Sequence, residues 1–227
     1  MDEQGIVTFL LVRHGRTLLN QSGRFRGRSP VSLDPLGVWQ AAQVAQRLAD
    51  LCGPGGPYPP PVAVGSSPLP RAVETAQPIG AATGAPLRVL DGLADLDYGA
   101  WQGQTPVEAA RRDPELYQRW LRDPEHVPAP GGESLGVMQW RALGVLQQCL
   151  DESQAGQCWV LVAHDVVWRA VFCWALRIRL GQRDQFGQDP AALNILELAL
   201  TPEHLPVLRT VNDTAHLQGQ ADWADSP

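Results

Sequence analysis

The sequence predicts an α/β fold, a three-layer arrangement in which a mostly parallel sheet carries helices on both faces. Short apolar runs rich in β-branched residues alternate with longer segments of helical periodicity, which is the pattern of repeated strand–helix–strand units. Two of the runs, Ile6–Val12 and Cys158–Ala163, are apolar almost throughout. Such strands are typical of parallel sheets that helices cover on both sides.

The length and composition favour one domain. The chain has 227 residues, of which 44% are hydrophobic and 19% are charged, as in an ordinary globular domain. We expect that domain to span residues 1–212. Residues 213–227 lack a hydrophobic period, which predicts a flexible C-terminal tail.

Several classes of function and location are disfavoured by composition. A net charge of −6 argues against a nucleic-acid partner, and all 18 basic residues are arginine, which excludes lysine Schiff-base chemistry. No apolar run reaches the roughly 18 residues that a membrane span needs, and the acidic start does not match a signal peptide. The four cysteines form no C-x-x-C pair, so we expect buried thiols in a cytoplasmic, reduced protein.

The first half of the chain alternates strand and helix. The strand Ile6–Val12 leads into a long loop over residues 16–31, and Asp34-Pro35 then begins a helix as N-cap and first helical residue, ending at about Leu51. The elements that follow are a short buried strand, a helix that Pro78 should kink or shorten, and a third strand: Val62–Gly65, Ala72–Thr83 and Leu87–Leu90.

The second half continues the same alternation. We predict two short helices, a long helix that begins at Glu133-Ser134, a buried strand, a further helix and two closing strands: Thr105–Arg112, Pro114–Leu121, 134–152, Cys158–Ala163, Val166–Leu176, Asn194–Leu200 and Val207–Asn212.

Polar side chains follow three of the predicted strands. Arg13-His14 ends the first strand, Arg71 lies just beyond the second, and His164 ends the fourth. The carboxyl ends of parallel strands share one edge of the sheet, where ligands bind. Arginine offers forked donors that match phosphate oxygens, and histidine can act as nucleophile or acid–base group near neutral pH. The sequence therefore predicts a site for a tetrahedral anion, with Asp95 or Asp97 after the third strand as a proton donor.

Six ordered segments resemble the histidine phosphatase superfamily, also called phosphoglycerate mutase-like, and in particular its phosphatase branch. They are L-V-R-H-G-R-T with Asn20, R-F-R-G-R at Arg24–Arg28, S-S-P-L-P-R-A-V-E-T-A at Ser66–Ala76, L-A-D-L-D-Y-G-A-W-Q-G at Leu93–Gly103, P-G-G-E-S-L at Pro130–Leu135 and V-A-H-D at Val162–Asp165. A lone R-H-G recurs by chance, whereas six ordered segments at predicted strand ends and loops are specific. The resemblance covers about Val7–Arg177.

The resemblance implies a role for each residue of the reaction centre. His14 corresponds to the nucleophile that becomes phosphohistidine. Arg13, Arg71 and His164 correspond to the residues that hold the phosphoryl oxygens. Asp95 stands at the position of the family's acid, which protonates the leaving alkoxide and then activates water. The family's site holds no metal, and we expect no cofactor here.

The resemblance also implies contacts to the rest of the substrate. Asn20 corresponds to an additional phosphate donor, and Arg26, Gly27 and Tyr98 match positions that face the remainder of the substrate in relatives. Tyr98 equally fits a role in loop packing.

Two positions depart from the family pattern. Asp95 stands where many relatives have the longer Glu, which leaves Asp97 as a competing candidate for the acid. Asp165 follows His164 where glycine is common. We favour a role for Asp165 in hydrogen-bonding the start of the next helix, over an effect on the charge of His164.

The leading hypothesis is a phosphomonoesterase that acts on a small phosphorylated metabolite. The alternative is a cofactor-dependent mutase of the phosphoglycerate mutase type, which the pair Arg111-Arg112 keeps open because mutase relatives clamp the substrate with basic residues after the Y-G segment. A third hypothesis is a non-catalytic anion-binding module. The substrate, and whether the chain forms a homodimer, are left open by the sequence.

Overall fold

The computed structural model describes residues 5–21, 23–201 and 203–218, and in these a six-stranded sheet has the order β3-β2-β4-β1-β5-β6. The strands are β1 Ile6–Arg13, β2 Val64–Ser66, β3 Leu87–Val89, β4 Cys158–Ala163, β5 Leu193–Ala199 and β6 Val207–Asp213. The four strands from β3 to β1 are mutually parallel, whereas β5 pairs antiparallel with both β1 and β6. The prediction of a mostly parallel α/β sheet is confirmed.

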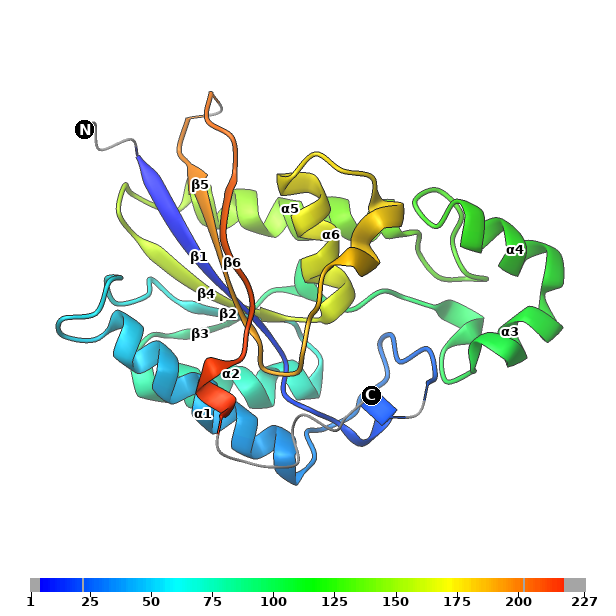
Figure 1. The fold of residues 1–227 in the computed structure, drawn as a ribbon, viewed down its shortest axis with the longest axis horizontal. Coiled ribbons are helices and arrows are strands. Elements are labelled where there is room, and N and C mark those ends of the chain that lie inside the picture. Colours follow the sequence, from blue (N-terminus) through cyan, green and yellow to red (C-terminus); the bar gives the residue numbers. More distant parts are fainter. Residues whose placement is uncertain (1–4, 22, 202, 219–227) are drawn as a thin grey trace.

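Four helices cover the two faces of the sheet (Figure 1). On one face lie α1 (Pro35–Cys52) and α2 (Pro70–Thr83), and on the other lie α5 (Leu135–Asp151) and α6 (Asp165–Ala175). Successive side chains of a strand point to opposite faces, so the apolar strands β1 and β4 supply both layers of the core.

The core residues of β1 show this division. Leu10 and Val12 belong to the cluster formed with α1 and α2, whereas Phe9 and Leu11 belong to the cluster formed with α5 and α6. All four side chains are fully buried. The strand therefore lies inside the core up to its C-terminal end, where the polar residues that follow it leave the sheet.

Local signals set the helix boundaries. The Asp34 carboxylate accepts a hydrogen bond from the backbone N–H of Gly37 at 2.8 Å at the start of α1, as predicted. The Ser134 hydroxyl caps α5 in the same way. Pro78 does not shorten α2. The helix begins at Pro70, earlier than expected, and continues past Pro78 to Thr83.

Two short helices, α3 (Pro106–Arg112) and α4 (Pro114–Arg122), lie apart from the helices that cover the sheet (Figure 1). They enclose a separate aromatic cluster in which Trp101 and Trp120 pack at 90° with centroids 5.8 Å apart. Phe25 from the long loop packs on this cluster and on Tyr98. The cluster therefore holds the loop after β1 against the segment after β3.

The C-terminal boundary of the domain differs from the expected one. Asp213 belongs to β6, and a 3-10 turn, η5 (Ala215–Leu217), packs against the domain with Leu217 fully buried. The expected tail from residue 213 is therefore wrong up to Leu217, since an isolated apolar residue carries no period that a sequence pattern reveals. Residues 219–227 of the expected tail lie outside the described residues.

Other expectations concern thiols and membranes. All four cysteines are buried with free thiols, as expected from the apolar patterns around them. Within the described ranges, none of the helices has the length and apolar character needed to cross a bilayer.

Candidate active site

The site forms where three neighbouring strands end. In the sheet, β4 lies between β1 and β2, and the register pairs Arg13 with Ala163 and Ser66 with Val162. The residues immediately after these pairs therefore leave the sheet at one edge. The segment after β2 begins α2 at Pro70, which places Arg71 in the first turn of that helix.

His14 is held with one ring nitrogen free to react. Its Nδ1 lies 2.7 Å from the backbone oxygen of Gly15, and because a carbonyl oxygen only accepts, Nδ1 carries the proton. Nε2 is then the unprotonated nitrogen, and Arg71 donates to it from Nε at 3.3 Å. Burial, reinforced by the charge of Arg71, lowers the pKa of His14 well below its usual value. A neutral imidazole with an unprotonated ring nitrogen is the form that acts as a nucleophile.

His164 is the second histidine of the site. Its ring centroid lies 5.1 Å from that of His14, and its Nε2 lies 2.8 Å from the Ser67 hydroxyl. Its Nδ1 lies 3.7 Å from Asp95 Oδ2 and has no hydrogen-bond partner among the described residues. Burial and then the charge of Arg71 lower the pKa of His164 well below its usual value.

Two buried arginines supply the positive charge. Arg71 donates from Nη2 to the Gly27 oxygen at 2.8 Å and to Asp95 Oδ2 at 2.9 Å. Arg13 donates from Nη1 to the Gln188 oxygen, and its buried Nε has no partner among the described residues. An unpartnered buried donor is costly unless an acceptor binds there, so Arg13 Nε and His164 Nδ1 together suit an anion.

The two candidate acids have different surroundings. Asp95 is 5% exposed and lies in hydrogen-bond contact with Arg71. Burial raises the pKa of Asp95, although the charge of Arg71 opposes the shift. Asp97 instead accepts from the Gly99 N–H at 2.8 Å and pairs with Arg28 at 3.5 Å. The geometry brings Asp95, and not Asp97, next to the histidines.

Sequence reasoning missed the residue that holds the Asp95 loop. Arg141 of α5 donates to the backbone oxygens of Gly92, Ala94 and Asp95, and it forms an ion pair with Glu133 at 2.6 Å. The available signal was a lone arginine inside an otherwise apolar helical stretch. Such a residue must be paired where it is buried.

The expected outer contacts lie in different places. Arg26, Gly27 and Tyr98 line a pocket outside the histidines. Gly27 adopts a left-handed φ of 47°, and a Cβ there would lie 2.9 Å from the Leu96 oxygen, so this turn favours glycine. Asn20 is directed into its own turn, where its Oδ1 accepts from the N–H and hydroxyl of Thr17.

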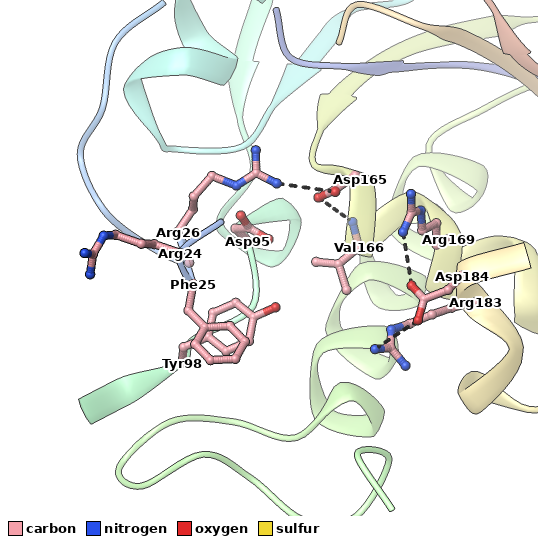
Figure 2. Close-up of a pocket in the computed structure, with 11 residues that line it drawn as sticks. Arg24, Phe25, Arg26, Asp95, Tyr98, Asp165, Val166, Arg169, Arg183 and Asp184 are labelled. Carbon is pink, nitrogen blue, oxygen red and sulfur yellow. Dashed lines mark hydrogen bonds and ion pairs between the residues drawn. The ribbon is translucent and has the colours of Figure 1, made fainter. Parts of the chain in front are cut away.

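The pocket has a volume of about 140 Å³, and Asp95 connects it to the histidines. Figure 2 shows Phe25 and Tyr98 on one side and Arg169, Arg183 and Asp184 on the other. The last three were missed for two reasons. Arg169 lies in a predicted helix but was not expected to face the site, and Arg183 and Asp184 lie in residues 177–192, which carry no period and for which no element was predicted. The structure forms a 3-10 helix in that stretch, η4 (Leu180–Gln185).

Asp165 hydrogen-bonds the start of α6, the role favoured from the sequence, and it also lies near two arginines. Its Oδ1 accepts from the Val166 N–H at 2.9 Å at the start of α6, and its Oδ2 lies 3.5 Å from Arg26 and 4.0 Å from Arg13. Burial alone would raise the pKa of Asp165, but Arg13, Arg26 and Arg169 outweigh it and hold that pKa well below its usual range. The carboxylate therefore stays ionised beside the pocket.

The remaining ionisable groups suggest no further reaction centre. Across the described part of the chain, no group of three or more His, Cys, Asp or Glu side chains has the arrangement of a metal site. Arg111 and Arg112, which kept the mutase hypothesis open, are exposed on α3 and do not line the pocket.

Comparison with known proteins identifies the class. The model of the histidine phosphatase superfamily (branch 1) matches residues 9–214. The chain is 31% identical over 216 residues to phosphoserine phosphatase 1 of Hydrogenobacter thermophilus, covering 93% of this chain and 95% of that protein. It is 30% identical over 219 residues to a metal-independent phosphoserine phosphatase of Arabidopsis thaliana, covering 95% and 85%.

Solved structures agree with the sequence relatives. The native structure of a mycobacterial glucosyl-3-phosphoglycerate phosphatase matches with a TM-score of 0.78 and 25% identity, covering 92% of this chain and all of that one. The protein thus belongs to the histidine phosphatase superfamily, and it is a phosphatase. The resemblance inferred from the six segments is confirmed.

Proposed function

We propose that the protein is a phosphomonoesterase that hydrolyses a small phosphorylated metabolite through a phosphohistidine at His14. The observation that carries this proposal is the hydrogen bond from His14 Nδ1 to the Gly15 oxygen. It fixes the tautomer in which Nε2 is unprotonated and carries a lone pair. In the same site, Arg13, Arg71 and His164 offer donors to the three equatorial oxygens of a transferring phosphoryl group.

In the first step, His14 Nε2 attacks phosphorus. The N–P bond forms as the ester P–O bond breaks, and Asp95 gives its proton to the leaving alkoxide oxygen. The raised pKa of Asp95 supports this role, because a general acid must hold its proton near neutral pH. Arg71 contacts both His14 Nε2 and Asp95, and so lies where negative charge develops.

In the second step, the Asp95 carboxylate takes a proton from water. The water oxygen attacks phosphorus, the N–P bond breaks, and inorganic phosphate and neutral His14 are released. The positive charge comes from arginine and histidine side chains, so we propose that the reaction needs no metal, as the name of the Arabidopsis relative states for that protein.

The pocket supports a small leaving group. Its volume of about 140 Å³ lies below the ~300–1,000 Å³ typical of sites for drug-sized ligands. Phosphoserine, the substrate that the names of two relatives give, is a first candidate on these grounds. Arg26, Gly27 and Tyr98 are then proposed to contact the leaving group, and Asn20 to act through the turn that it closes. The free thiols fit a cytoplasmic location.

A labelling experiment tests the proposal. The protein is mixed with a phosphomonoester in the presence of a chelator and quenched with denaturant at alkaline pH, at which phosphohistidine is stable. We expect label on His14 and release of inorganic phosphate. No label and no phosphate release across a broad panel of esters would overturn the hydrolase. Fast transfer of the label to a substrate hydroxyl, with little phosphate released, would establish the mutase instead.

A further inference from the structure

We propose that Arg169 of α6 and Arg183 of η4 form a second anion subsite, which binds an anionic group on the leaving group of the substrate. The inference rests on the proposed phosphomonoesterase function and adds a selectivity to it. The subsite lies on the side of the pocket opposite Phe25 and Tyr98 (Figure 2).

Helix geometry explains the position of Arg169. It follows Asp165 by four residues in α6, so the two side chains share one face of the helix, one turn apart. Since Asp165 faces the pocket beside Arg26, Arg169 faces the same pocket one turn further out. Its Nε is buried and has no partner among the described residues, so it remains available as a donor.

Packing on both sides of η4 fixes the position of Arg183. Leu180 at the start of η4 is 3% exposed. Just beyond the end of η4, Phe186 packs edge-on against Phe172 of α6, with ring centroids 5.7 Å apart. The segment is therefore attached to α6 before and after Arg183, which presents the guanidinium from a fixed element.

The charges of the subsite are not balanced. Asp184 lies 3.1 Å from Arg169 and 3.5 Å from Arg183, so one carboxylate is shared by two arginines. Its side chain is 65% exposed, and exposed ion pairs contribute little free energy. A substrate anion can therefore take its place between the two guanidinium groups.

In the neighbouring ion pair between Arg26 and Asp165, the carboxylate is harder to displace than that of Asp184. The Asp165 side chain is 21% exposed, accepts a backbone hydrogen bond from Val166, and is held ionised by the arginines around it. Displacing it from Arg26 would leave a partly buried carboxylate without that partner, which costs more than breaking an exposed pair. The exchangeable anion of the pocket is consequently Asp184 and not Asp165.

Two guanidinium groups match the geometry of a carboxylate and of a phosphate equally well. Two pairs of substrates show which of these anions the subsite binds. For a carboxylate, kcat/KM is measured on 3-phosphoglycerate and on glycerol 3-phosphate, which lacks the charge. For a phosphate, propane-1,3-diol bisphosphate is compared with its monophosphate. We expect the wild-type enzyme to prefer the anionic member of at least one pair, and the larger preference identifies the group that binds.

Two variants of the subsite should change the use of the anionic ester in opposite directions. Arg183→Gln should lower kcat/KM for the preferred anionic ester by about 10- to 100-fold, because a hydrogen bond to a charged group is lost, and should leave the neutral member of the pair nearly unchanged. Asp184→Asn removes the competing carboxylate and should lower KM for the anionic ester. Arg209→Gln, which replaces an exposed arginine of β6 that pairs with Glu197 of β5, is the matched control and should change neither kcat/KM nor KM.

The outcomes separate this inference from the function on which it rests. Equal rates for both members of each pair, or equal losses on both in Arg183→Gln, would overturn the subsite while the enzyme remains a phosphatase. An Asp184→Asn variant with a higher KM for the anionic ester would also overturn it. Absence of phosphohistidine and of phosphate release from any ester would overturn the proposed function itself.

Discussion

Two regions of the site contain similar side chains but differ in exposure. The reaction centre consists of Arg13, His14, Arg71, Asp95 and His164, and the pocket rim consists of Arg24, Arg169, Arg183 and Asp184. The reaction centre is buried, with His14 and Arg71 each 2% exposed and His164 fully buried. At the rim, the Arg24 side chain is 42% exposed and that of Asp184 is 65% exposed. Charges attract strongly where water is excluded and weakly where it is present.

The arginines of the two regions also differ in their hydrogen-bond partners. Arg13 and Arg71 donate to backbone oxygens of residues far away in sequence, Gln188, Gly27 and Ser29. The Arg169–Asp184–Arg183 group of the rim is instead joined through side chains. Backbone contacts from packed segments fix a group more firmly than exposed ion pairs do. Under the proposed function, the firmly held reaction centre would carry out the chemical step and the more exposed rim would select among substrates.

The largest expected effect is that of His14→Ala. Removing the nucleophile should lower kcat by at least about 10⁴-fold, the scale of losses seen when a covalent catalyst is deleted, and should abolish the phosphohistidine label. His126→Ala, at an exposed position far from the site in sequence, is the control. Retention of label in the His14 variant, with its circular dichroism unchanged, would contradict the assignment of the nucleophile.

The next effect distinguishes the two aspartates. Asp95→Asn should lower kcat about 10²- to 10⁴-fold for alkyl phosphates, because the leaving alkoxide then lacks its acid. It should matter much less for p-nitrophenyl phosphate, whose leaving group needs no proton. Asp97→Asn is the matched control, and it should cost less on both substrates. The reverse order of the two variants on alkyl phosphates would make Asp97 the acid.

Two ion pairs test how burial changes what a pair contributes to stability. One is the partly buried pair that holds the Asp95 loop, and the other is an exposed pair at the rim. Arg141→Met should lower the free energy of unfolding by about 3 kcal/mol, because it removes the closest ion-pair partner of the half-buried Glu133 and the hydrogen bonds to three backbone oxygens of the Asp95 loop. Arg24→Met breaks the exposed pair with Glu108 and should cost only about 0.5 kcal/mol. Urea unfolding measures both values. Equal losses would show that burial does not separate the two regions as argued.

The pH dependence of stability should report the buried histidines. The folded pKa values of His14 and His164 are lowered, so the stability that their neutral forms contribute is complete above about 6.5, the unfolded value. It is lost as the pH falls below that value, since unfolding then takes up a proton at each ring. The two groups together predict a loss of at most about 3 kcal/mol between pH 7.5 and 5.5.

A variant at one histidine checks the size of this loss. His14→Gln should reduce the loss by about half, as measured by urea unfolding at the two pH values. The exposed His126 has a raised pKa beside Asp123, so its contribution has the opposite sign, and His126→Gln should slightly enlarge the loss. A loss that is the same in wild type and His14→Gln would mean that His14 is not buried in its neutral form.

The sequence was sufficient where local patterns carry the information. The apolar runs of β1 and β4 predicted both strands to within a residue at either end, and the cap at Asp34 located the start of α1. The sequence was insufficient where contacts between distant segments decide. Pro78 was expected to kink or shorten α2 because a helix loses one hydrogen bond there, yet the packed helix is not shortened and continues to Thr83.

The same difference between local patterns and contacts of distant segments applies to the site. By itself, the sequence determined that His14 and His164 follow buried strands and therefore meet at one edge of the sheet, since continuous apolar runs mark both strands and the carboxyl ends of parallel strands share an edge. Only the tertiary structure decided that Asp95 rather than Asp97 turns towards Arg71, and that η4 brings Arg183 beside Arg169. Those outcomes depend on how Arg141, Leu180 and Phe186 anchor irregular segments, and irregular segments have no period to read.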